Sequence, residues 1–171
     1  YLSTILDDYS RYIVAWKLCT SMKAGDVTDT LELALEASGC AHAMVVQRPR
    51  LLSDNGSSYV AADLADYLED KGMDHVRGAP HHPQTQGKIE RWHQTMKNRV
   101  LLENYFLPGD LERQIDAFVD HYNNRRYHES LGNLTHADVY HGRGAQILKM
   151  REEIKEQTIR RRRLQHQSAA A

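Results

Sequence analysis

The stretches Ser53-Asp54-Asn55-Gly56 and Gln86-Gly87-Lys88-Ile89-Glu90-Arg91 decide the fold of this chain. The first places Asp54 directly after the apolar segment 51–53, at the carboxyl end of a strand, where α/β sheets hold their ligands. The second places Glu90 on a long helix. Carboxylate oxygens suit Mg²⁺, and Mg²⁺ commonly serves phosphate chemistry. Together the stretches predict an acidic metal site, whereas Asp54 alone would fit an ordinary strand-to-helix turn.

The rest of the chain predicts strands first and helices later. Residues 1–7 and 12–19 are rich in Ile, Val, Leu, Tyr and Trp, and a polar turn joins them, which is typical of an antiparallel hairpin. Apolar periodicity, glycine stops and prolines place the other elements. We expect strands over 51–53 and 75–76, a loop over 78–86, and helices over 22–38, 59–71, 87–104, 110–122 and 145–163, with Pro108-Gly109 as a break and Asp110 as an N-cap. This order predicts an α/β fold with a mixed sheet flanked by helices.

The helix that carries Glu90 has two different faces. Its apolar face consists of Ile89, Trp92, Met96 and Val100. Its polar face places Glu90 among amides and a cation, namely Gln86, Gln94 and Lys97. Such a face suits contact with a phosphate backbone while the acid binds metal. A solvated amphipathic helix would show a similar pattern.

Charge is distributed unevenly along the 171 residues. Residues 143–171 carry eight Lys or Arg against three Asp or Glu, whereas residues 1–142 carry fourteen against twenty. We therefore predict an acidic core over 1–142 and a basic helical tail over 143–171 that meets a polyanion. Its best candidates for phosphate contact are Arg160, Arg161, Arg162 and Arg163. A solvated basic helix end remains the alternative.

Several classes of protein are disfavoured by composition. Cys19 and Cys40 are the only cysteines, which favours free thiols in a reducing cytoplasm over a disulfide scaffold. No stretch is apolar enough for a membrane span. The histidines at 81, 82 and 93 have no cysteine partner, so a zinc site is not expected. The chain begins at Tyr1 without an initiator Met, inside an apolar run, so we expect a fragment whose preceding strand is missing.

The motifs as a set resemble one family. The chain is similar to the catalytic core of DDE-type integrases and transposases, which have the ribonuclease H-like fold, and most similar to transposases of IS3-type insertion sequences. The stretches that carry this resemblance cover nearly the whole chain: Tyr1-Leu2, Asp7-Asp8-Tyr9-Ser10-Arg11-Tyr12, Ser53-Asp54-Asn55-Gly56-Ser57, 82–91, 122–128, Leu131-Gly132 and 135–140.

The resemblance implies a function and roles for particular residues. Asp54 would be the second catalytic acid and Glu90 the third, and both would bind Mg²⁺ or Mn²⁺. Lys97, Arg91 and Gln86 would contact DNA. The implied partners are transposon ends, target DNA and further copies of the chain, with no membrane and no small-molecule substrate, in the bacterial cytoplasm. The implied reaction is metal-dependent cleavage and strand transfer.

The chain departs from the family pattern at the first acid. That acid belongs to an Asp-x-Thr motif on a strand before Tyr1, and no such motif is present. Asp7 and Asp8 occupy a place where the family has an acid that is not a metal ligand. We therefore expect the isolated chain to bind Mg²⁺ weakly and to be nearly inactive. A smaller departure is His136, which stands where the family usually has Pro and is expected in a loop.

Two other functions are compatible with parts of the pattern. A non-catalytic module that binds DNA or another protomer would explain the missing first acid. A nuclease of the same fold that hydrolyses RNA in hybrids would share the acids. The 86–91 motif and the stretch 122–128 argue against the nuclease.

Overall fold

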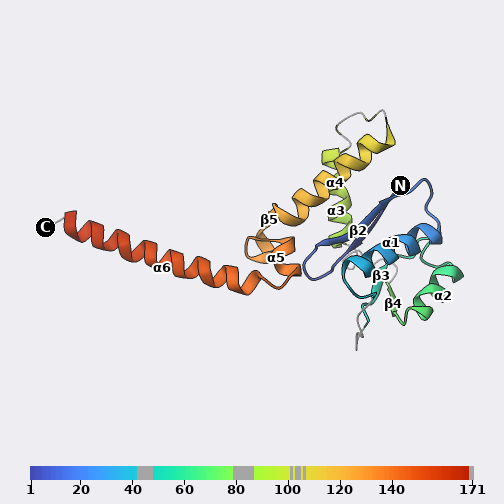
Figure 1. Ribbon diagram of the computed structural model, residues 1–171, viewed down its shortest axis with the longest axis horizontal. Coiled ribbons are helices and arrows are strands. Elements are labelled where there is room, and N and C mark those ends of the chain that lie inside the picture. Colours follow the sequence, from blue (N-terminus) through green and yellow to red (C-terminus); the bar gives the residue numbers. More distant parts are fainter. Residues whose placement is uncertain (42–47, 79–86, 101, 103–104, 106, 170–171) are drawn as a thin grey trace.

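The computed structural model describes residues 1–41, 48–78, 87–100, 102, 105 and 107–169. The chain is an α/β protein, as predicted (Figure 1). The elements, in chain order, are β1 (Leu2–Leu6), β2 (Ile13–Leu18), α1 (Ala24–Ala37), β3 (Leu51–Ser53), α2 (Ala62–Asp70), β4 (His75–Arg77), α3 (Gly87–Val100), α4 (Pro108–Asn124), β5 (Tyr127–His128), the short 3-10 helix η2 (Glu129–Leu131), β6 (Leu134–Thr135), α5 (His136–Tyr140) and α6 (Gly144–Ala169).

The strands contain both kinds of pairing expected of a mixed sheet. Strands β1 and β2 form the predicted antiparallel hairpin, and β3 and β4 pair in parallel. A third antiparallel pair, β5 and β6, lies within the polar stretch after α4, where no strand was expected. In the part of the chain that the structure describes, these pairs are three separate two-stranded sheets.

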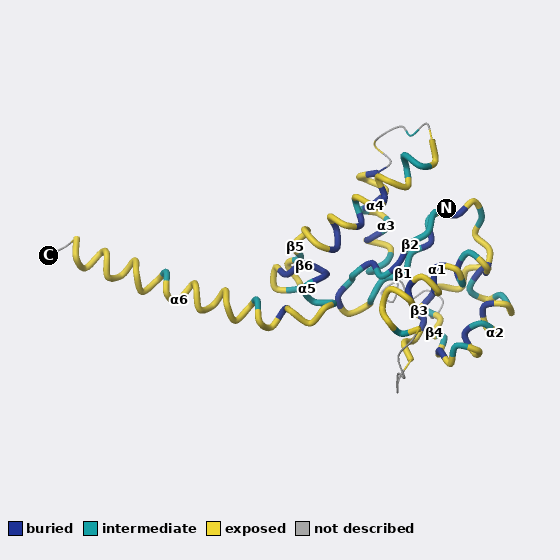
Figure 2. The backbone as a smooth tube through the Cα atoms, in the orientation of Figure 1, coloured by how far each residue is buried: buried dark blue, intermediate teal, exposed yellow. Residues whose placement is uncertain are grey.

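Two apolar clusters pack on the β1–β2 hairpin. Helices α1 and α2 and strand β3 form the first cluster, which includes Val27, Leu31, Leu35, Leu51, Leu64 and Leu68. Helices α3 and α4 and strand β2 form the second, which includes Ile13, Trp92, Met96, Val100, Ile115, Val119 and Tyr122. Alternate residues of β1 serve the two sides, since Ile5 packs on the first cluster while Leu2 and Leu6 pack on the second. Figure 2 shows burial concentrated at the hairpin and the helix faces that meet it.

Several element boundaries differ from the predicted ones. Helix α4 begins at Pro108, so proline starts this helix instead of breaking it. Proline suits the first helical position because the N–H that it lacks would have no helical partner there. Asp110 consequently lies in the first turn and pairs with Arg113, and the prediction that it is the N-cap is wrong. Helix α2 starts at Ala62, three residues later than expected, and is preceded by a turn in which the Tyr59 N–H donates to the Gly56 carbonyl oxygen at 2.9 Å.

The C-terminal segment is one long helix that stands apart from the rest. Helix α6 has 26 residues, and Gly144 is its one buried residue among those the structure describes. Figure 1 shows it projecting away from the β1–β2 hairpin and helices α3 and α4. A Cβ at residue 144 would lie 2.8 Å from Leu134 Cδ1, so a larger residue there would require the Leu134 side chain to shift. No helix in the described ranges is long and apolar enough to cross a membrane.

A buried amide fastens helix α4 to strand β2. Asn123 is buried, its Oδ1 accepts a hydrogen bond from the Ile13 N–H, and its Nδ2 donates to the Ile13 carbonyl oxygen, both at 2.9 Å. The side chain thus pairs with both backbone groups of Ile13, much as a neighbouring strand would.

Replacing Asn123 with Ala is expected to lower the free energy of unfolding by about 2–4 kcal/mol, because two buried backbone groups lose their partners. Urea denaturation measures this loss. Asn124→Ala is the matched control, since Asn124 is exposed and bonds only within α4, to Asp120. Equal losses in the two variants would contradict the role given to Asn123.

Candidate active site

Asp54 follows β3 at the carboxyl end of the parallel pair, as predicted. Its side chain is exposed, and Oδ1 accepts a hydrogen bond from the Gly56 N–H at 2.8 Å. A Cβ on residue 56 would lie 2.9 Å from this same oxygen, so the conformation of Asp54 requires glycine there. The preceding residue, Ser53, is buried and its Oγ lies 2.8 Å from His75 Nε2. The strand end is therefore fixed while the carboxylate stays open to solvent.

Glu90 lies in the first turn of α3, where a helix N-terminus favours negative charge. Its carboxylate is exposed, and the opposite face of the helix buries Trp92, Met96 and Val100, as the apolar spacing predicted. Lys88 fixes the start of the helix. Its Nζ lies 2.8 Å from the Asp8 carboxylate and 2.7 Å from the Asp8 carbonyl oxygen, in the β1–β2 turn.

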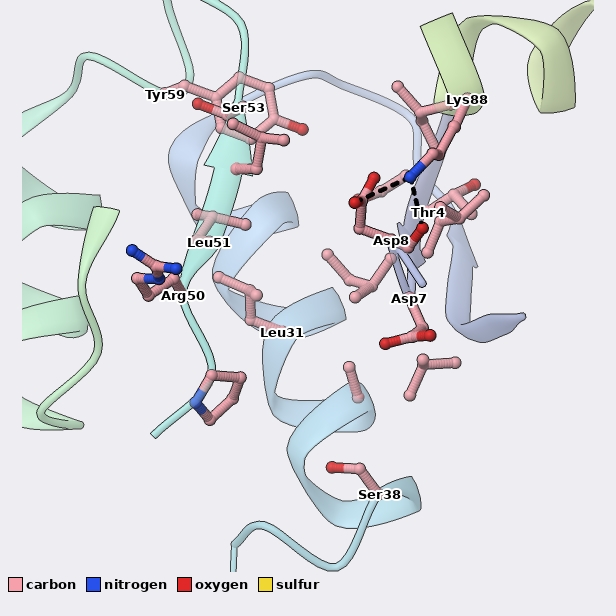
Figure 3. A pocket seen from close by; sticks show the side chains of 18 of the residues that line it. Thr4, Asp7, Asp8, Leu31, Ser38, Arg50, Leu51, Ser53, Tyr59 and Lys88 are labelled. Atoms are coloured by element: carbon pink, nitrogen blue, oxygen red, sulfur yellow. Dashed lines mark hydrogen bonds and ion pairs between the residues drawn. The ribbon is translucent and has the colours of Figure 1, made fainter. Parts of the chain in front are cut away.

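Both acids border one cavity of about 710 Å³. It is lined by β1, by α1, by residues 49–54 around β3 and by the first turns of α3, so Asp54 and Glu90 border the same space although they come from different elements. Figure 3 shows Leu51 and Ser53 on one side, Thr4, Asp7 and Asp8 on the other, and Leu31 of α1 between them. That both acids serve one metal site stays a prediction from the two motifs.

The two other acids at the cavity are engaged in local structure. Asp7 Oδ2 accepts hydrogen bonds from the Ser10 N–H at 2.7 Å and from the Ser10 hydroxyl at 2.6 Å, which shapes the β1–β2 turn. Asp8 pairs with Lys88. That neither acid is a metal ligand stays a prediction.

The carboxylate oxygens of Asp54 and Glu90 are of the chemical type that Mg²⁺ prefers. Asp54 and Glu90 offer exposed carboxylate oxygens, and Mg²⁺ is commonly held by one or two carboxylates together with water and phosphate oxygens. Within the described ranges, no three residues of the His, Cys, Asp and Glu types are grouped closely enough to hold a metal. The residues present therefore suit a Mg²⁺ ion that takes its other ligands from water and phosphate.

His93 belongs to the same cavity and was missed as a site residue. It follows Glu90 by three residues, which is the spacing that puts two side chains on one helix face and could have identified it. Burial lowers the pKa of His93, and the charge of Lys97 lowers it further. The imidazole is consequently neutral at pH 7 and adds no positive charge beside the acids.

Three arginines, Arg11, Arg91 and Arg126, form a basic cluster around His128. Arg91 directly follows Glu90 in the sequence. Arg11 Nη1 donates a hydrogen bond to His128 Nε2 at 2.6 Å. Burial lowers the pKa of His128, and the charges of Arg11, Arg126 and Arg91 lower it further, so all three guanidinium groups are close enough to act on it. The cluster was not predicted as a set, because its members come from distant parts of the chain. No local spacing reveals them.

The other predicted DNA contacts lie in different places. Lys97 is exposed on α3, three residues before its end. Gln86 lies outside the described residues. The arginines 160–163 are exposed far along α6, which Figure 1 shows pointing away from α3, so the structure does not bring them to the two acids. Across the described ranges, the recorded ion pairs include neither Lys97 nor these four arginines.

His136 is buried beneath the basic cluster, at the first position of α5, so the prediction of a loop there is wrong. Its ring stacks on Tyr122 at 4.3 Å, and Nδ1–H donates to the Ser10 carbonyl oxygen at 2.9 Å. A first helical position also explains why proline is compatible with this site in the family. Burial lowers the pKa of His136, although the bond to Ser10 acts in the opposite direction.

Stability is expected to fall as the pH drops from 7.5 toward 5.5. The unfolded chain binds a proton at His136 near its ordinary pKa of 6.5, while the folded chain binds it only at lower pH. The stabilisation is therefore complete above pH 6.5 and is lost below it. His136→Asn should reduce the slope of unfolding free energy by up to about 1.4 kcal/mol per pH unit. His166→Asn, exposed on α6, is the control, and an unchanged slope in His136→Asn would contradict the assignment.

Residues 1–83 and residues 71–135 each match a family model described as integrase core domain. The transposase for insertion sequence element IS629 of Shigella sonnei is 30% identical over 143 residues, which cover 81% of this chain and 45% of that protein. The chain thus spans less than half the length of this curated relative. The Pol polyprotein of equine infectious anemia virus (strain Wyoming) is 31% identical over 74 residues, which cover 40% of the chain and 6% of the polyprotein.

Solved structures have a similar fold. A chain of the simian T-cell lymphotropic virus intasome, in complex with the PP2A regulatory subunit B56 gamma, aligns with a TM-score of 0.68 at 16% identity, covering 82% of this chain and 48% of that one. The trimeric form of the HTLV-2 integrase catalytic core domain in complex with magnesium aligns with a TM-score of 0.63 at 15% identity, covering 81% and 83%. At such identities the likeness concerns the fold alone.

Proposed function

Because this chain belongs to the integrase core domain family, with the ribonuclease H-like fold, we propose that it is the catalytic core of a DNA transposase. In this proposal Asp54 and Glu90 bind Mg²⁺ or Mn²⁺ and serve the cleavage and joining of DNA strands. The observation that carries it is the convergence of these two exposed carboxylates on one cavity. The core comprises residues 1–142, and residues 143–171 form a basic arm.

The residues of the site have distinct parts in the proposed reaction. Asp54 and Glu90 concentrate negative charge where a divalent ion would bind. The bound ion would activate the attacking oxygen and stabilise the leaving oxygen at phosphorus. Arg91 and the neighbouring guanidinium groups of Arg11 and Arg126 would hold the phosphate backbone beside the acids, since arginine binds phosphate oxygens in pairs. Attack by water would cleave a strand, and attack by the freed 3′-hydroxyl would join it to target DNA.

The partners of the whole protein are proposed from its relatives. An intasome is an assembly on DNA, and the HTLV-2 integrase core was solved in dimeric and trimeric forms. We infer that this chain works on DNA in the bacterial cytoplasm as a homo-oligomer. Mg²⁺ accompanies the HTLV-2 core, which supports a divalent ion for this family.

The test compares Mg²⁺-dependent strand transfer by the chain as it stands and by a form extended with an upstream strand that carries Asp-x-Thr. We expect the extended form to be active on duplex DNA and the shorter form to be nearly inactive, because two carboxylates neutralise less metal charge than three. An RNA–DNA hybrid serves as the competing substrate. Failure of the extended form on all DNA would overturn the enzyme proposal, and cleavage of the hybrid alone would favour a nuclease.

A second candidate function is DNA binding without catalysis, and the exposed arginines of α6 favour it. Replacing Arg160, Arg161, Arg162 and Arg163 together with Gln should weaken duplex binding and lower the slope of log affinity against log salt by up to about 3–4, since each lost phosphate contact removes about 0.9. Gel-shift titrations at several salt concentrations measure this slope. An unchanged slope would show that the α6 arginines are merely solvated.

A further inference from the structure

Helix α6 carries apolar side chains that the rest of the described chain leaves uncovered. Met150, Ile154 and Leu164 are 48%, 62% and 60% exposed. All residues from Leu148 to Ala169 are exposed except Thr158, which is half-buried. Helices in proteins owe most of their stability to the packing of an apolar face, so this length of α6 is expected to have a partner.

The start of α6 is fastened to the connection between β5 and β6. Arg151 Nη1 donates to the carbonyl oxygens of Gly132 and Asn133, at 3.3 Å and 3.0 Å. Beyond Arg151, the recorded side-chain hydrogen bonds and ion pairs of the described residues stay within α6, as in the pairing of Lys155 with Glu152. Figure 1 shows this outer part of α6 projecting away from α5. It can therefore meet another molecule without disturbing the core.

One face of α6 has the residue spacing of a coiled coil. Steps of three and four residues in alternation follow one face of a helix. From the half-buried Ile147, these steps lead to five further residues, which together with it form the α6 seam: Met150, Ile154, Gln157, Arg161 and Leu164. Four of the six seam residues are apolar. The exposed Ile159 lies outside the seam, about 140° around the helix from Ile154.

Charge is divided between the two halves of the same helix. The acids Glu152, Glu153 and Glu156 come first, and the four arginines at 160–163 follow them. In an antiparallel pair of identical helices, the first half of each copy lies against the second half of the other. A second copy of α6 is therefore complementary in charge to the first, as well as in its apolar seam.

The residues that flank the seam favour one register. With Ile154 of one copy against Gln157 of the other, Glu153 lies beside Arg160 of the second copy, twice by symmetry. Sliding one copy by seven residues instead places Glu153 against Glu153, or Arg160 against Arg160. A parallel pair in register would bring the two copies of Arg161 together within the seam. Like charges therefore disfavour these alternatives.

We propose that α6 pairs with α6 of a second copy of this chain, in the antiparallel register that places Ile147 of one copy against Leu164 of the other. The paired length would be roughly 26 Å, at about 1.5 Å per residue. Arg162 and Arg163 lie outside the seam, so pairing leaves them accessible to phosphate. This interface involves neither acid of the candidate active site, and the proposal holds whether or not the chain is catalytic.

Sedimentation equilibrium of the whole chain, without DNA or metal, tests the charge pairing. We expect Glu153→Arg and Arg160→Glu, each alone, to weaken self-association about tenfold or more, because each change places like charges opposite each other twice. An equimolar mixture of the two variants should associate within about threefold of the parent, since both contacts then join opposite charges. A mixture that associates no more tightly than the single variants, or a parent that stays monomeric at every soluble concentration, would overturn the proposal.

Substitutions on two sides of α6 test the seam itself. Ile154→Asp buries a charge in the proposed seam and should weaken self-association about tenfold or more. Ile159→Asp is the matched control outside the seam and should change it by less than about twofold. Both residues are exposed in the single chain, so both variants should keep its circular dichroism. Equal weakening by the two variants, or none by Ile154→Asp, would assign association to another surface and overturn the proposal.

Discussion

Replacing Asp54 with Asn, or Glu90 with Gln, is expected to lower Mg²⁺-dependent strand transfer at least about a thousandfold in the form extended by the Asp-x-Thr strand, which corresponds to about 4 kcal/mol in the barrier. Each substitution keeps the size of the side chain and removes one of the two negative charges that converge on the cavity. The ion would therefore be held less tightly and supply less stabilisation at phosphorus. A strand-transfer assay over a range of Mg²⁺ concentrations measures both effects.

Asp66→Asn and Glu112→Gln are the matched controls, because both acids are exposed on helices outside the cavity. They should leave activity within about twofold, as surface substitutions usually do. Circular dichroism should show that all four variants are folded, since Asp54 and Glu90 are themselves exposed. If either site variant kept activity within tenfold of the parent, the two-carboxylate site would be wrong.

Trp92→Ala is expected to lower the free energy of unfolding by about 3–5 kcal/mol, as for other buried Trp or Phe truncations. Trp92 is only 1% exposed and packs against Phe118 and Tyr122, with ring centroids 5.7 Å and 4.6 Å away. Its ring thus joins α3 to α4 within the second apolar cluster. A small domain has about 5–15 kcal/mol of stability in total, so urea denaturation should show a much earlier midpoint.

Trp92→Phe should cost clearly less than Trp92→Ala, because the indole Nε1 is buried with no hydrogen-bond partner among the described residues. The phenyl ring keeps most of the apolar contact and removes this unpaired donor. Similar losses for both variants would show that the indole nitrogen has a partner or that the ring shape is indispensable.

The parts of the fold that follow from local pattern could be predicted from the sequence. The spacing of Trp92, Met96 and Val100 identified the buried face of α3, and the apolar run before Asp54 identified β3. Strand pairs without a local sequence pattern could not be predicted. Strands β5 and β6 have two residues each, which is too short for any alternation to show.

The site likewise contains residues that the sequence could identify and residues that it could not. Asp54 and Glu90 sit in local motifs and were identified directly, although their roles stay a prediction. The cluster of Arg11, Arg91 and Arg126 forms because the hairpin, α3 and the end of α4 are close in space. The sequence alone does not show that these three segments are close. The burial of His136 likewise depends on Tyr122 and Ser10, which are distant in sequence.

The length of helix α6 determines how far its arginines lie from the core. At about 1.5 Å per residue, the arginines at 160–163 stand roughly 24–29 Å along the helix from Gly144. That is the length of about seven or eight base pairs of duplex, at 3.4 Å each. Since α6 is one uninterrupted helix, removing a single residue from it would shift these arginines by about 1.5 Å and turn them by about 100°. The number of residues in α6 therefore sets both the distance of these arginines from Gly144 and the direction in which they face.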